Sequence, residues 1–192
     1  MKTLLRPAIT LFVILSLITG IVYPITVTAI TQTILNESSN GSLIIKDGQP
    51  IGSKLIGQNF VASRYFWGRP SATLPQPYNG TSSGGSNQGP LSQALADAVK
   101  TRIEVLHAVD PENKLPIPVD LVTASASGLD PDISLAAARY QTTRIAKARH
   151  ISPENVLSLI DTHTQERQWG IFGETRVNVL QLNLALDNAQ GK

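Results

Sequence analysis

The sequence predicts one N-terminal transmembrane helix followed by a single small α/β or α+β domain outside the cytoplasm. Residues 7–35 contain no charged side chain, and about 20 helical residues already cross a hydrocarbon core of roughly 30 Å. Lys2 and Arg6 precede this run without any acidic residue, which favours a cytoplasmic N-terminus. Residues 1–35 are therefore the cytoplasmic tip and anchor, residues 36–41 (NESSNG) a polar linker, and residues 42–192 the extracytoplasmic domain.

A cleaved signal peptide is the alternative to a retained anchor. Residues 8–22 would be its apolar core and residues 27–29 (VTA) its small-residue cleavage site. The mature chain would then begin at Ile30 and be a secreted binding protein. The uncharged run continues past this site, and its apolar core is at the long end of the usual ~7–15 residues. These two observations favour the anchor.

The outer half of the anchor predicts both a kink and a contact surface. Pro24 has no backbone N–H, and its ring would meet the carbonyl group of Gly20, so a kink is expected. Four threonines make two opposed pairs at about 100° per residue. Their hydroxyl groups either bond the backbone of their own helix or cross to another helix. We predict that one pair packs against a partner helix, with lipid around the rest: Thr26 with Thr33, or Thr28 with Thr31.

The first half of the domain predicts a hairpin, a long loop and a helix. Residues 42–46 and 51–56 are β-prone, and Asp47-Gly48 between them favours a hairpin turn. Residues 71–90 are dense in Gly, Pro, Ser and Asn, which predicts an irregular surface loop. Pro90 is then expected to open a helix that ends near Val109. Its apolar face would consist of Leu91, Leu95, Val99, Ile103 and Leu106.

The second half predicts two strands and two helices. Residues 121–125 are β-prone, and residues 128–134 (GLDPDIS) predict a turn whose Asp130, Asp132 or Ser134 caps a helix over residues 135–149. Ser152-Pro153 opens another helix. Residues 176–187 alternate apolar and polar side chains, which predicts a strand with a bulge near residues 179–180.

Two stretches are candidate partner contacts. Residues 63–70 concentrate aromatic side chains between two arginines. This composition is typical either of a core corner with arginines over ring faces or of a binding hot spot. In residues 128–132, Gly128 has conformational freedom and Pro131 fixes the turn, so that two carboxylates project beside a helix N-terminus. The candidates are Tyr65, Phe66, Trp67, Arg69, Gly128, Asp130, Pro131 and Asp132.

Composition and motif searches exclude several functional classes. The chain has 16 basic and 14 acidic residues, and the part after the anchor is neutral without a dense basic cluster, so no nucleic-acid partner is expected. The absence of cysteine excludes thiol catalysis and zinc–thiolate sites. The three histidines form no metal motif, and residues 71–90 lack the lysine of a P-loop. We therefore predict no catalytic residue, no metal site and no directly bound cofactor. A membrane-anchored Ser–Lys hydrolase that uses Ser125 or Ser127 remains the alternative.

Five stretches, in their order along the chain, carry a resemblance to a known family. They are residues 65–73 (YFWGRPSAT), 77–90 (PYNGTSSGGSNQGP), 119–134 (VDLVTASASGLDPDIS), 144–149 (RIAKAR) and 176–187 (RVNVLQLNLALD). Together with the anchor they closely resemble the C subunit of the Kdp-type potassium-transporting ATPase of bacteria and archaea. The resemblance extends from the anchor through Asp187.

The resemblance implies a complex in the plasma (inner) membrane. Its partners would be a potassium-conducting subunit and a P-type ATPase subunit, which handle potassium and ATP/Mg for the complex. The C subunit would be a non-catalytic accessory protein needed for assembly and activity, possessing one span and an extracytoplasmic domain. A role as a chaperone for ATP binding also comes with the family. That role conflicts with the predicted topology, because an exported domain cannot touch cytoplasmic ATP.

Overall fold

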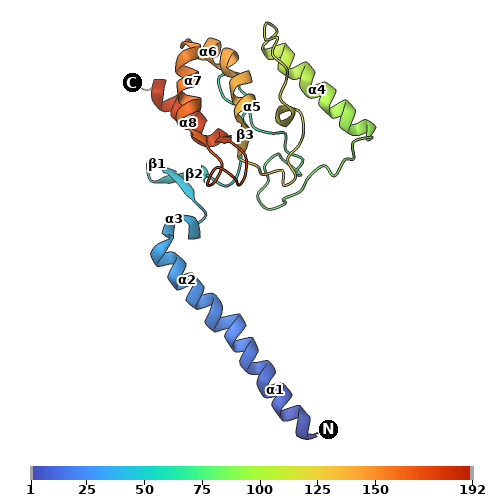
Figure 1. Ribbon diagram of the computed structural model, residues 1–192, viewed down its shortest axis with the longest axis vertical. Helices are drawn as coiled ribbons and strands as arrows, with labels where there is room; N and C mark the ends of the chain where they lie inside the picture. Colours follow the sequence, from blue (N-terminus) through green and yellow to red (C-terminus); the bar gives the residue numbers. More distant parts are fainter. Residues whose placement is uncertain (1, 191–192) are drawn as a thin grey trace. The chain divides into compact units, whose positions relative to one another are not determined.

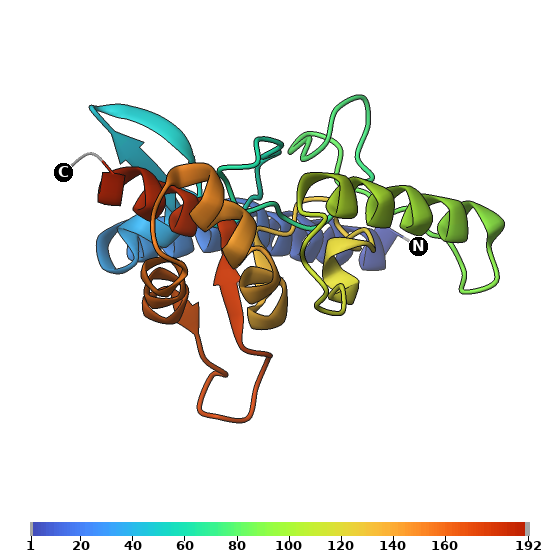
Figure 2. The ribbon, with the colours of Figure 1, turned by 90° about the horizontal axis from the view of Figure 1, so that it is seen from above.

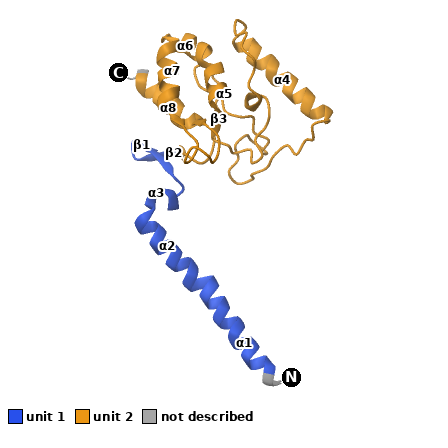
Figure 3. Cartoon of the chain, viewed as in Figure 1, with its two compact units in different colours: residues 1–51 blue, residues 52–192 orange. Residues whose placement is uncertain are grey.

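The computed structural model describes the backbone of residues 2–190 and the side chains of residues 4–189. Met1 and the Lys2 side chain of the predicted cytoplasmic tip lie outside this part, as do the last two residues of the predicted domain. The chain divides into two compact units, Met1–Ile51 and Gly52–Lys192 (Figure 3).

The first unit contains the anchor. Helix α1 (Lys2–Leu17), a π-helical turn η1 (Ile18–Val22) and helix α2 (Tyr23–Ile34) follow one another as a continuous helix (Figure 1). Residues 4–34 of it, 31 residues in all, are long and apolar enough to cross a membrane, with a length of about 46 Å. Its large apolar side chains are exposed on all sides, which is the property of a helix surrounded by lipid.

The π-helical turn stands where the sequence predicts a kink at Pro24. The N–H group of Tyr23 donates to the carbonyl of Ile18, five residues earlier. A π turn widens the helix locally, so the helix continues past a proline that has no N–H to donate. Helix α2 also runs unbroken through residues 27–29.

After the anchor, the predicted linker contains a short helix, α3 (Asn36–Ser39), so it is more regular than expected. Strands β1 (Leu43–Lys46) and β2 (Gln49–Ser53) then pair as the predicted hairpin. Asp47 and Gly48 between them have φ values of 51° and 76°, as a type I′ turn requires at both central residues. The return strand begins and ends earlier than the predicted residues 51–56.

The second unit is built on a three-stranded antiparallel sheet in the order β3-β5-β4. Its strands are β3 (Asp132–Ser134), β5 (Arg176–Asn178) and β4 (Thr164–Gln165). Val177 of the central strand lies opposite both Ile133 and Thr164. Four helices gather around this sheet (Figure 1): α5 (Leu135–Tyr140), α6 (Thr142–Arg149), α7 (Pro153–Thr162) and α8 (Val179–Gln190). Of the two predicted classes, the antiparallel sheet corresponds to α+β.

One hydrophobic core joins these elements. We call residues 63–70 the aromatic segment. The largest fully buried apolar side chains of the core come from the sheet, from α6 to α8 and from the aromatic segment: Phe66, Ile133, Ile145, Val156, Ile160, Val177, Leu182 and Leu186. Helix α4 (Gln93–Val109) adds Leu106, with Val99 and Ile103 partly buried against the core. This helix begins three residues after Pro90, so the prediction of Leu91 on its apolar face is wrong. The Leu91 side chain is 99% exposed.

The strand predicted over residues 176–187 is wrong after Asn178. Strand β5 ends there, and α8 begins at Val179. The side chains of Val179, Leu182, Asn183 and Leu186 are buried, at the i, i+3, i+4, i+7 spacing of a helix. Asn183 interrupts this apolar face in the sequence, and the leucines on either side of it happen to alternate.

Three other predictions need correction. Residues 121–125 contain no strand, because the chain there leaves a 3₁₀ turn, η2 (Val119–Leu121). The end of the predicted turn over residues 128–134 forms β3. The helix predicted over residues 135–149 breaks at Gln141 into α5 and α6. The Ser134 hydroxyl caps α5 by accepting from the Ala137 N–H group, whereas neither aspartate does so.

Candidate partner-contact site

Two buried amides fix the aromatic segment in place. Asn183 on α8 accepts from the Phe66 N–H group at 2.8 Å and donates to its carbonyl at 3.0 Å. Gln141, between α5 and α6, does the same for Trp67 at 2.8 and 3.1 Å. Phe66 and Trp67 lie in no strand, so each amide satisfies backbone groups that have no partner strand. Neither residue was predicted from the sequence. Their only signal is a polar side chain within an otherwise apolar helical face.

Arginines of α6 cover the rings of this segment. The Arg144 guanidinium carbon lies 4.4 Å from the centroid of the Trp67 ring, and that of Arg149 lies 4.9 Å from the Tyr65 ring. Arg144 donates to the Tyr65 carbonyl at 3.0 Å, and Arg149 pairs with Asp187 at 2.8 Å. Burial lowers the pKa of Arg144 to about 10, so this arginine stays charged at neutral pH.

These contacts agree with the prediction that residues 63–70 form a corner of the core with arginines over the rings. The arginines closest to the ring centres, however, come from α6, which is far away in the sequence. Phe66 is wholly buried, so it supports the corner from inside. Tyr65 and Trp67 are partly exposed and stay candidate contacts.

The structure joins the two predicted contact stretches. Arg69 Nη1 lies 3.2 Å from Asp130 Oδ2, and the two side chains are 28% and 30% exposed. The other carboxylate oxygen of Asp130 accepts from the Asp132 N–H group at 3.0 Å. The negative charge of Asp130 is thus compensated by Arg69 rather than presented alone.

The loop over residues 71–90 packs against residues 124–129. The Ser71 hydroxyl donates to the Gly128 carbonyl at 2.7 Å, and the Gly84 N–H group donates to the Ser127 carbonyl at 2.9 Å. Gly128 has a φ of +67°, and a Cβ atom there would lie 2.5 Å from Thr73 Cγ2 and 2.7 Å from the Gly84 oxygen. Only glycine therefore fits this close approach of the two segments.

Pro131 and Asp132 connect this junction to the sheet. The Pro131 carbonyl accepts from the Val179 N–H group at 2.9 Å. Asp132 pairs with Arg176 at 2.9 Å and accepts from Asn178 at 3.2 Å. Burial raises the pKa of Asp132, Arg176 lowers it and nearby Asp130 raises it. Acidic and basic groups are thus mixed on this face, with no uncompensated charge of either sign at these pairs.

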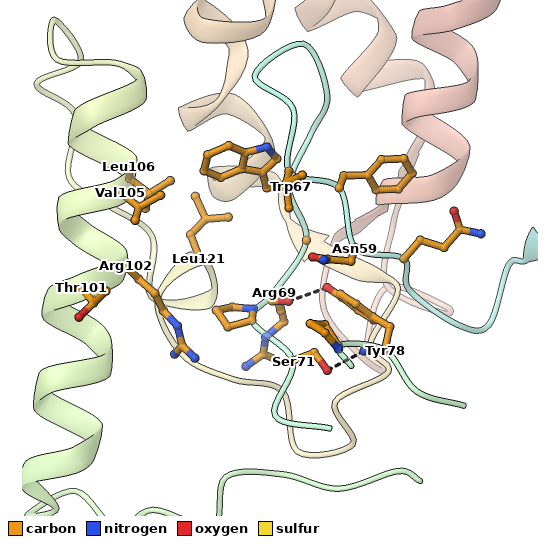
Figure 4. Close-up of a pocket in the computed structure, with 16 residues that line it drawn as sticks. Asn59, Trp67, Arg69, Ser71, Tyr78, Thr101, Arg102, Val105, Leu106 and Leu121 are labelled. Atoms are coloured by element: carbon orange, nitrogen blue, oxygen red, sulfur yellow. Dashed lines mark hydrogen bonds between the residues drawn. The ribbon is translucent and has the colours of Figure 1, made fainter. Parts of the chain in front are cut away.

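A cavity of about 420 Å³ lies between α4 and the residues around Trp67 and Tyr78 (Figure 4). Arg102, Val105 and Leu106 line it from α4, and Trp67 and Tyr78 are among the lining residues opposite. The Tyr78 hydroxyl donates to the Arg69 carbonyl at 2.5 Å, and burial raises its pKa to about 12. This tyrosine is therefore a neutral structural donor. Polar side chains, Arg69 and Ser71 among them, share the lining with the apolar and aromatic ones.

The described residues show no catalytic constellation. The Ser127 hydroxyl accepts from the Leu129 N–H group at 3.1 Å, while Ser125 is buried. No described lysine lies in hydrogen-bond contact with either serine, so the hydrolase alternative is not supported. The described part of the chain contains no group of three or more His, Asp or Glu side chains that could hold a metal ion. His163 instead contacts the Leu159 carbonyl, and His150 ends α6 in the left-handed conformation.

The anchor threonines mostly satisfy their own hydroxyl groups. Thr26 donates to the Val22 carbonyl at 2.8 Å, Thr31 to Val27 at 2.9 Å and Thr33 to Ile30 at 2.8 Å. Such bonds leave small side chains that a neighbouring helix can approach closely. It stays a prediction that one of the two pairs packs against another helix, either Thr26 with Thr33 or Thr28 with Thr31.

Comparison with known proteins identifies relatives along nearly the whole chain. The family model "KdpC: K+-transporting ATPase, c chain" matches residues 5–188. A potassium-transporting ATPase KdpC subunit of Dechloromonas aromatica is 65% identical over 188 residues, covering 98% of each chain. The same subunit of Polynucleobacter asymbioticus is 63% identical over 187 residues, covering 97% of this chain and 99% of the relative. That of Herminiimonas arsenicoxydans is 59% identical over 187 residues, covering 97% and 98%.

Proposed function

The chain belongs to the KdpC family of K⁺-transporting ATPase c chains, and we propose that it is the non-catalytic accessory subunit of such a complex. Its partners would be a potassium-conducting subunit and a P-type ATPase subunit, which handle potassium, ATP and magnesium. The observation that carries the proposal is the family match, which includes the anchor as well as the domain.

We place the protein in the plasma membrane with its N-terminus in the cytoplasm and its domain outside. Arg6 and the sequence position of Lys2 support this orientation. The uncharged run continues past residues 27–29 to residue 35, and this supports a retained anchor over a cleaved signal peptide. In this orientation the domain docks over the outer mouth of the potassium-conducting subunit.

In this docked position, the Arg69–Asp130 pair would influence how readily potassium reaches the complex. Asp130→Asn removes the carboxylate and leaves the Arg69 charge uncompensated. If the pair faces the outer mouth, the local potential becomes more positive and potassium is repelled. The variant is then expected to raise the potassium concentration needed for half-maximal ATPase activity of the complex, more strongly at low ionic strength.

The matched control is the double variant Arg69→Gln with Asp130→Asn, which removes both charges and should restore the potassium dependence. An unaltered potassium dependence of the single variant in an assembled complex would contradict the ion-access role and leave Asp130 as a structural turn residue.

Affinity purification of the full chain from membranes tests the assembly. We expect the potassium-conducting and ATPase subunits to co-purify, with intact mass showing an uncleaved N-terminus. Ser125→Ala with Ser127→Ala should leave the ATPase activity of the complex unchanged. A chain that purifies alone and begins at Ile30 would refute the proposal. Protease added outside spheroplasts should degrade the domain and spare the N-terminus.

A further inference from the structure

The connection between β4 and β5 exposes three large apolar side chains at its tip. Trp169, Ile171 and Phe172 are 81%, 74% and 60% exposed. Figure 2 shows the orange-red segment that carries them extending away from the helices of the second unit. We call residues 168–172 the apolar tip. Exposing this much apolar surface at one point stabilises nothing within the second unit, so it needs another explanation.

The apolar tip is held by its own hydrogen bonds. Gln168 and Phe172 exchange backbone N–H to carbonyl bonds at 2.9 and 3.0 Å, and the Gly170 N–H group donates to the Arg167 carbonyl at 3.0 Å. The Phe172 ring meets the Trp169 ring edge-on, with 6.1 Å between centroids. The side chains are thus presented as a preorganised group, which lowers the entropic cost of binding.

Trp169 occupies a backbone position that favours glycine. Its φ is +55°, in the left-handed region that is strained for a residue other than glycine. Because the indole is 81% exposed, its contacts within the chain offset little of this backbone strain. A tryptophan at such a position is explained by a contact outside the chain.

The charges beneath the apolar tip favour a protein over a lipid surface. Arg167 is paired with Glu174, and Glu166 accepts from the Thr175 hydroxyl at 3.0 Å. Within residues 164–178, Arg176 is also paired, with Asp132. No uncompensated basic cluster is therefore available here to attract anionic lipid. Aromatic residues at the centre of a polar rim are instead typical of a protein-binding hot spot.

We propose that the apolar tip inserts into an apolar pocket with a polar rim on the outward-facing surface of another subunit of the K⁺-transporting ATPase. This inference rests on the proposed function. The anchor helix and the apolar tip are then two separate attachment points, and the anchor keeps the domain at high effective concentration near its partner. Loss of the tip releases the domain without releasing the chain from the complex.

Photocrosslinking in the assembled complex tests the proposal. The photoreactive amino acid p-benzoylphenylalanine replaces Ile171 in the full chain, and the matched control carries it at Glu154, an exposed position in the first turn of α7. We expect crosslinks from position 171 to another subunit and none from position 154. Crosslinks from position 171 only to lipid, or to nothing, in a complex that co-purifies would overturn the inference alone. Failure of the complex to co-purify would overturn the proposed function as well.

A second variant separates binding from folding. Trp169→Gly removes the indole and relieves the positive φ, so the thermal stability of the full chain should stay unchanged or rise. The yield of crosslinks from position 171 should fall about tenfold or more, as for a hot-spot residue. An undiminished yield in this variant would overturn the role of Trp169.

Discussion

Asn183→Leu tests the contact that fixes the aromatic segment. Asn183 is 1% exposed, and its amide makes both hydrogen bonds to the Phe66 backbone. Leucine has the same number of side-chain heavy atoms and the same branching at Cγ, although its two methyl groups take more room than the amide, and it favours the helical conformation. It can neither accept from the Phe66 N–H group nor donate to its carbonyl, so the substitution removes polarity without emptying the core.

The magnitude follows from the two backbone groups left without a partner. Each unsatisfied buried group costs roughly 1–3 kcal/mol, so two cost about 4 kcal/mol. Burying the leucine side chain recovers about 2 kcal/mol. The expected net loss is therefore about 2 kcal/mol of unfolding free energy, which corresponds to roughly 4–8 °C in Tm for a domain of this size.

Thermal unfolding of the full chain in detergent, followed by tryptophan fluorescence, measures this loss. Trp67 is the next residue after Phe66, so its emission should also report local loosening. Asn188→Leu is the matched control, because Asn188 is an exposed position on the same helix. If Asn183→Leu and Asn188→Leu unfold at the same temperature, the buried amide does not hold the segment and the reasoning is wrong.

Three further predictions concern the junction, the sheet and the anchor. Gly128→Ala should lower the free energy of unfolding by about 1–3 kcal/mol and make residues 71–90 sensitive to protease. Gly84→Ala should do neither, because no atom lies within 4 Å of a Cβ built there. Equal proteolysis of the two variants would show that Gly128 is not needed for steric reasons. Burial raises the pKa of Asp132 above 3.8, so the native state binds the carboxyl proton of Asp132 more tightly than the unfolded state does. The free energy of unfolding should therefore fall as the pH rises from 3.8 through the pKa of the folded state. Asp132→Asn should flatten this slope in pH-dependent unfolding, and a slope identical to wild type would assign it to another group. Replacing the four anchor threonines by leucine should reduce recovery of the complex while membrane insertion stays normal; undiminished recovery would show that the domain alone drives assembly. These residues are Thr26, Thr28, Thr31 and Thr33.

Local sequence signals predicted the elements whose causes are local. The uncharged run, the Asp47-Gly48 turn and the Ser152-Pro153 helix start each depend on neighbouring residues, and the structure contains all three. The break at Gln141 and the start of α8 at Val179 were not predictable in this way. Gln141 and Asn183 face inward because the backbone of the aromatic segment needs partners from a part of the chain more than 70 residues away.

The residue types of the candidate site were predictable from the sequence, but which residues contact one another was not. The sequence showed that arginines and aromatic rings would meet, yet the arginines over Trp67 and Tyr65 come from α6. The pairing of Arg69 with Asp130 depends on how an irregular loop folds back, for which there is no periodic signal. The exposure of the apolar tip has no signal in the sequence, because it becomes visible only when the core is complete.

The most direct test of the accessory-subunit proposal compares the complex with and without this chain. The potassium-conducting and ATPase subunits are purified from membranes of cells that express or lack it, and potassium-stimulated ATP hydrolysis is measured. We expect stimulated hydrolysis only when the chain is present, and no hydrolysis by the chain alone. Full potassium-stimulated activity without the chain would contradict the proposal, as would ATP hydrolysis by the purified chain itself.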